Sequence, residues 1–167
     1  MRTDVATQLR RQLAAHRASE LLYGAVVSAS VLAVASVHSD QADRVALATI
    51  GVAIIYWLTH VYVDAIGGRF LDPDHATLWR LRHAVSTNWA VLVGAAPPVL
   101  VYLLGRAVGL GVATAGWVAM WSAVVLLMVA GGIAGHRAGA RGRALVAEVA
   151  VCGSLGVVVI ALKYLLH

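Results

Sequence analysis

Residues 45–66 read VALATIGVAIIYWLTHVYVDAI, a run of 22 residues in which Asp64 is the one acidic side chain. A helix needs roughly 20 apolar residues to cross the hydrocarbon core of a bilayer. The run has that length, and its apolar residues are continuous, whereas a membrane-spanning strand would alternate apolar and polar residues. We therefore expect a transmembrane helix here.

The rest of the chain has a similar composition. Of its 167 residues, 60% are hydrophobic and 13% are charged, and the mean hydropathy is +0.81. A soluble globular domain usually has about 45–50% apolar and about 25% charged residues. The composition excludes a soluble enzyme and a disordered regulator, and the single cysteine excludes a disulfide scaffold. An integral membrane protein remains.

Five stretches are long and apolar enough to be spans: residues 21–37, 45–66, 89–105, 112–135 and 144–166. The predicted fold is therefore an all-α, polytopic membrane bundle, with residues 1–167 forming a single transmembrane domain.

Two segments outside the spans are also expected to be helical. Residues 1–19 have the pattern of an amphipathic helix on the cytoplasmic membrane surface. In the long linker 67–88, Asp72 and Pro73 are typical of the start of a short helix.

The distribution of basic residues predicts the orientation of the chain. Ten of the 13 Lys and Arg residues lie before the first span, in the linker 67–88 or between the last two spans. With five crossings these segments share one side, which the positive-inside rule assigns to the cytoplasm. The N-terminus is then cytoplasmic and the C-terminus external, in the plasma (inner) membrane.

Two other interpretations of the basic residues are disfavoured. The net charge of +5 does not indicate nucleic-acid binding, because the arginines form no long basic run and follow the orientation pattern. The start of the chain resembles a secretory signal ending at Ala33-Val34-Ala35, but its basic region is long for one. We interpret it as a retained first helix.

Ionisable side chains in or beside the spans are the candidates for function, because each costs at least ~2.5–3.5 kcal/mol at the bilayer centre. Tyr56, His60 and Asp64 follow one another at four-residue spacing and share a helix face. Asp64 lies at the end of its helix, where a negative charge is disfavoured, so His60 or Arg69 is its expected cation. The candidates for an ion pathway or proton relay are Glu20, Tyr56, His60, Asp64 and Glu148. A purely structural polar network is the alternative.

Other motifs are less specific. Pro97 and Pro98 interrupt the third span and predict either a static kink or a hinge. His60 and Asp64 have the spacing of two metal ligands, but two ligands are half a site, so no metal or cofactor is expected. The sequence has no HExxH, GxSxG, P-loop or Rossmann pattern, and we do not expect an enzyme.

Two motifs carry a resemblance to a known family. Residues 20–24, ELLYG, and residues 56–62, YWLTHVY, resemble signatures of an uncharacterised family of small multi-pass membrane proteins from high-GC bacteria. The likeness includes Asn88-Trp89 and Glu148. The family has no established activity, so the resemblance implies a recurring arrangement of the glutamates and the histidine but no function.

The sequence favours a homo-oligomeric channel or carrier for a small cation or for protons in the lipid bilayer. Several copies around an axis can form a pore more easily than one small bundle. Small residues of the first span (Gly24, Ser28, Ala25, Ala29, Ala33) and of the fifth (Cys152, Gly156) are the expected contacts between copies. A non-transporting scaffold or sensor subunit is the alternative, and an intramembrane enzyme is a third.

Overall fold

The computed structural model describes residues 2–39, 41–71 and 76–165, and this part of the chain folds into five helices. They are α1 (Arg2–His38), α2 (Ala42–Leu71), α3 (Thr77–Ala107), α4 (Val112–Arg137) and α5 (Arg143–Leu165). Each contains a segment long and apolar enough to cross a membrane. The predicted all-helical, membrane-spanning class is confirmed, whereas the orientation of the termini stays a prediction.

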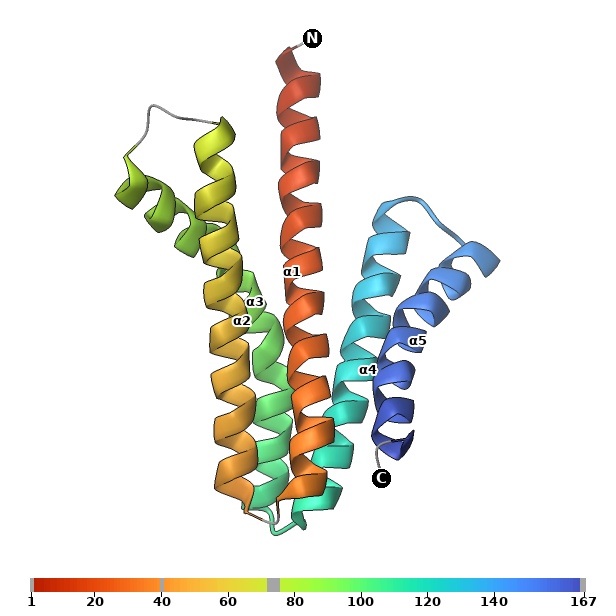
Figure 1. Ribbon diagram of the computed structural model, residues 1–167. Coiled ribbons are helices and arrows are strands. Elements are labelled where there is room, and N and C mark those ends of the chain that lie inside the picture. Colours follow the sequence, from red (N-terminus) through yellow and green to blue (C-terminus); the bar gives the residue numbers. More distant parts are fainter. Residues whose placement is uncertain (1, 40, 72–75, 166–167) are drawn as a thin grey trace.

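The helices run alternately up and down a bundle (Figure 1). The start of α1, the end of α2, the start of α3, the end of α4 and the start of α5 lie at one end, which we call the N-terminal end. The connections from α1 to α2 and from α3 to α4 lie at the opposite end, together with the end of α5. Helix α1 packs against all four of the others.

Two helix boundaries differ from the sequence prediction. Residues 2–19 form no separate surface helix but are the first turns of α1, because the sequence from Arg2 to Glu20 has no glycine or proline to interrupt it. The linker 67–88 is mostly helical as well, since α2 extends to Leu71 and α3 begins at Thr77. The predicted start at Asp72 and Pro73 lies outside the described residues.

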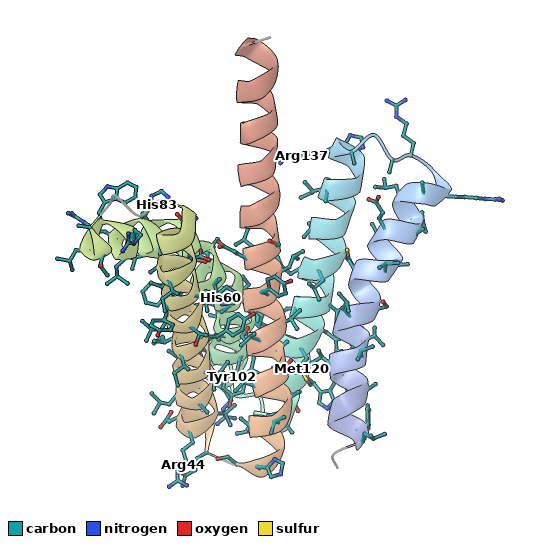
Figure 2. The ribbon with its side chains drawn as sticks, turned by 45° about the horizontal axis from the view of Figure 1, so that its top comes forward. Arg44, His60, His83, Tyr102, Met120 and Arg137 are labelled. Carbon is teal, nitrogen blue, oxygen red and sulfur yellow. The ribbon has the colours of Figure 1, made fainter. Side chains whose placement is uncertain are left out.

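A tightly packed core lies toward the end opposite the N-terminal end. Tyr102 is fully buried there, and Figure 2 shows it on the side of His60 that faces Arg44. Its cluster consists of Leu32, Val45, Ala46, Tyr102, Ala115 and Ala119. We call this region the packed half. The small alanines let four helices approach one another closely.

The crossing of α1 and α3 depends on two glycines. A Cβ atom added to Gly24 would overlap the carbonyl oxygen of Val91, and one added to Gly94 would overlap that of Leu21. The small-residue face of α1 is thus used inside the chain, and Gly156 of α5 likewise packs against Val124 of α4. Within one copy these faces are already occupied, and contacts between copies stay a prediction.

Candidate functional site

Polar side chains gather in the part of the bundle nearer the N-terminal end. They come from three helices, and we call them the polar half: Glu20 and Tyr23 on α1, Tyr56, His60 and Asp64 on α2, and Asn88 on α3. Figure 2 shows His60 on the side of Tyr102 that faces the N-terminal end. Two of the predicted helix-face residues, His60 and Asp64, are at the centre of this group.

His60 is held between two tyrosine rings. The ring centroids of Tyr56 and His60 are 4.5 Å apart, and those of Tyr23 and His60 are 6.5 Å apart. The Nδ1 atom of His60 lies 3.2 Å from the backbone oxygen of Tyr56, one turn earlier. Since Tyr23 is 54% exposed, the histidine sits beside the bundle surface between α1 and α2, and not in a closed core.

Asp64 is bound by an amide rather than by a cation. The Nδ2 atom of Asn88 donates a hydrogen bond of 2.6 Å to Oδ2 of Asp64 and another of 2.9 Å to the backbone oxygen of Ala84. Among the described residues no ion pair joins His60 to Asp64, and the Nδ1 of His60 is directed at its own helix. The side chain of Arg69, the other expected partner, lies outside the described side chains. The described partner of Asp64 is therefore neutral.

Glu20 lies on the face of α1 that packs against α3. Its residue is 2% exposed, and it precedes Gly24 by one helical turn at the glycine crossing. A carboxylate removed from water in this way costs several kcal/mol unless it is neutralised or receives hydrogen bonds. Among the five candidates for an ion pathway, Glu20 is the most deeply buried.

Glu148 lies apart from the other candidates. It is exposed on α5, and its Oε2 atom fills the space beside Gly135 of α4, where an added Cβ would overlap it. Helix α5 packs mainly against α4 and less against α1. The five candidate residues therefore occupy two places in the structure, with Glu148 on the α4–α5 pair.

Asn88 and Arg80 were not selected from the sequence. Asn88 is 1% exposed and links α3 to α2 through Asp64. The sequence holds a sign of this contact. Asn88 directly precedes the predicted span 89–105, and Asp64 lies near the end of the span 45–66, so the two residues are level if these spans are antiparallel neighbours. Arg80 is 9% exposed, and its Nη2 donates to Oγ1 of Thr77 at 3.3 Å. In the sequence, Arg80 contributed to the predicted orientation alone.

The two prolines lie within a continuous helix. Helix α3 extends from Thr77 to Ala107 through Pro97 and Pro98, and Pro98 is buried. Figure 1 shows that α3 is not straight, because its first turns lean away from α1. Whether the prolines act as a hinge stays a prediction.

Neither a group of metal ligands among the described residues nor a known relative assigns a function to the polar half. Within residues 2–39, 41–71 and 76–165, no three His, Cys, Asp or Glu side chains are grouped in a way that could hold a metal ion. Comparisons of this chain with protein-family models, with curated proteins and with solved structures give no match.

Proposed function

We propose that this membrane protein is a channel or carrier for a small cation, protons included, and that it works as a homo-oligomer. The observation that carries the proposal is Asp64: it is exposed on a membrane-spanning helix, and its described partner is the neutral amide of Asn88. An exposed carboxylate in a span is costly against lipid, and the cost falls when it lines a watery path or an interface.

The helix packing supports a path on the outside of the single bundle. Backbone atoms of α1 and α3 meet at Gly24 and Gly94, so an ion has no room to pass between these two helices. The α1–α2 side is more open: Tyr23 and His60 lie there, and a shallow apolar groove lined by Ser30, Val31, Val34, Ala35 and Ala48 follows the same pair. A second copy placed against this side would enclose His60 and Asp64.

The charges in the polar half favour cations. Asp64 contributes a carboxylate that no described cation neutralises, and the amide of Asn88 holds it in place. A positive charge on His60 would weaken the attraction for a cation, because His60 lies one helical turn from Asp64. Flux should therefore depend on pH.

Ion flux through the purified chain in liposomes tests the proposal. We expect a cation gradient to dissipate, Asp64→Asn to reduce the flux, and His60→Ala to flatten its pH dependence. Thr59→Val is the matched control, because Thr59 is exposed on the same turns of α2 and its hydroxyl bonds only to the backbone oxygen of Ile55, at 2.9 Å. Equal flux from wild type and both site variants would contradict the proposal.

A non-transporting scaffold or sensor is the second candidate, and one observation favours it. The Asn88–Asp64 bond joins α3 to α2, and the Tyr23–His60 contact joins α1 to α2, as expected of groups that only hold helices together. This function predicts no flux under pH or voltage steps, together with a loss of stability in both variants.

A further inference from the structure

The first three turns of α3, residues 77–88, differ from the rest of the helix. Figure 1 shows them leaning outward from the bundle at the N-terminal end, and we call them the interfacial segment. Within it, Arg80, Ala84 and Asn88 are buried at four-residue spacing. The remaining residues of the segment are largely exposed, so they face the surroundings of the protein.

The exposed residues of the interfacial segment form two stripes that lie side by side along the helix. Leu78, Leu81 and Val85 are 78%, 42% and 39% exposed and continue at helical spacing to Trp89, which is 54% exposed. At 100° per residue these four side chains share one side of the helix. Trp79, Arg82, His83 and Ser86, also exposed, share another side. The segment thus has a buried, an apolar and a cationic face.

The cationic face is ordered by contacts among its own residues. The rings of Trp79 and His83 stack with centroids 5.3 Å apart and an angle of 1° between their planes. The hydroxyl of Ser86 donates to the backbone oxygen of His83 at 2.7 Å. Arg82 lies between Trp79 and His83 along the chain, one residue before the histidine. The planar guanidinium of an exposed arginine presents its N–H donors in a fork that matches the oxygens of a phosphate group.

The place of the segment in the molecule indicates which phosphate it meets. Figure 2 shows His83 at the same end of the bundle as Arg137, and Arg44 at the other. Exposed Arg141 and Arg143 follow Arg137 in the chain. A helix with adjacent apolar and cationic faces at the end of a membrane-spanning bundle fits the boundary between acyl chains and headgroups.

We propose that the interfacial segment binds the headgroup of an anionic phospholipid, with Arg82 directed at its phosphate, the Trp79–His83 ring pair beside it, and Leu78, Leu81 and Val85 among the acyl chains. Aromatic rings are enriched at this depth of a membrane, and each basic residue near an anionic surface strengthens attraction about fivefold. The inference is independent of ion transport, because it concerns a different face of the protein.

A fluorophore on the cationic face measures this binding in the full chain. Ser86→Cys is labelled in a Cys152→Ser background, and the protein is reconstituted in phosphatidylcholine containing increasing fractions of phosphatidylglycerol with a headgroup quencher. The quencher is attached either to the phosphatidylglycerol headgroup or to the phosphatidylcholine headgroup. We expect half-maximal quenching at a lower fraction of the labelled lipid when that lipid is phosphatidylglycerol. Arg82→Gln should raise that fraction about fivefold. Arg82→Lys keeps the charge but loses the fork of donors, so it should raise the fraction by a smaller factor than Arg82→Gln.

Arg44→Gln is the matched control, because Arg44 is an exposed arginine at the opposite end and follows the exposed Asp43. We expect it to change the quenching fraction less than twofold. Three results would overturn the proposal: equal quenching by the two lipids, an Arg82→Gln effect no larger than that of Arg44→Gln, or release of the quencher by millimolar inorganic phosphate, which would indicate a site for the soluble ion. Quenching that appears only when copies separate would assign the face to a second copy instead.

Discussion

The packed half and the polar half of the bundle are built from the same helices but differ in how tightly their side chains are buried. In the packed half, Leu32, Val45 and Tyr102 are fully buried among alanines. In the polar half, Tyr23 and Asp64 are exposed, and Figure 1 shows the helices spreading apart toward that end. The difference indicates that packing at one end holds the fold together, while the other end is free to carry charges.

The chain connections reinforce this division. The α3–α4 turn closes the packed half: the Leu110 amide donates to the oxygen of Gly105 at 3.0 Å, and Gly109 adopts a φ of 90°. This left-handed conformation is readily available only to glycine, and the bonds satisfy carbonyls at the end of α3. A short turn therefore fixes α3 against α4 where the core is densest.

The largest effect is expected at the glycine crossing, on which both halves depend. Gly94→Leu would force α1 and α3 apart, because even a Cβ there overlaps the backbone of α1. We expect a loss of more than about 3 kcal/mol in the free energy of unfolding, beyond ordinary over-packing. Denaturation in mixed detergent micelles measures it. Gly51→Leu, which meets open space, is the control and should stay within about 0.5 kcal/mol. Equal losses in the two variants would show that the crossing is not tight.

The next effect tests the packed half alone. Leu32→Ala should cost about 2 kcal/mol, at the low end for such truncations, because lipid is as apolar as leucine and mainly packing contacts are lost. Leu47→Ala, at a residue that is 68% exposed, should cost less than about 0.5 kcal/mol. Thermal unfolding of the two variants in the same detergent compares them. Similar costs would mean that the core is loose.

In the polar half, the Asn88–Asp64 bond is expected to be weaker than the core contacts. A double-mutant cycle with Asn88→Ala and Asp64→Ala should give a coupling of about 0.6–1.7 kcal/mol, the range for hydrogen bonds between membrane helices. The cycle uses the same unfolding assay and removes the effect of truncating each side chain. A coupling near zero would mean that the amide does not hold the carboxylate in solution, and Asp64 would then lack its described partner.

The sequence predicted the spans and the ionisable residues of the polar half, but it did not predict which helices pack against each other. Length and hydropathy located the spans, because the bilayer requires them, and His60 and Asp64 stood out as ionisable residues in an apolar run. The crossing at Gly24 and Gly94 was not predictable, since many glycines in this chain face open space. The Asn88 contact and the separation of Glu148 also depend on which helices become neighbours, and hydropathy does not specify that.

The smallest effect is expected at a polar group of the packed core, the hydroxyl of Tyr102. It lies 3.5 Å from the backbone oxygen of Ala42, at the limit of a hydrogen bond, while the ring itself is fully buried. Tyr102→Phe keeps the ring and should therefore change the free energy of unfolding by less than about 0.5 kcal/mol. Tyr102→Ala is the matched variant, and it should cost about 3 kcal/mol because it leaves a cavity where α1, α2, α3 and α4 meet. If the phenylalanine variant lost more than about 1.5 kcal/mol, the packed half would also depend on a polar contact, and the contrast between the two halves would fail.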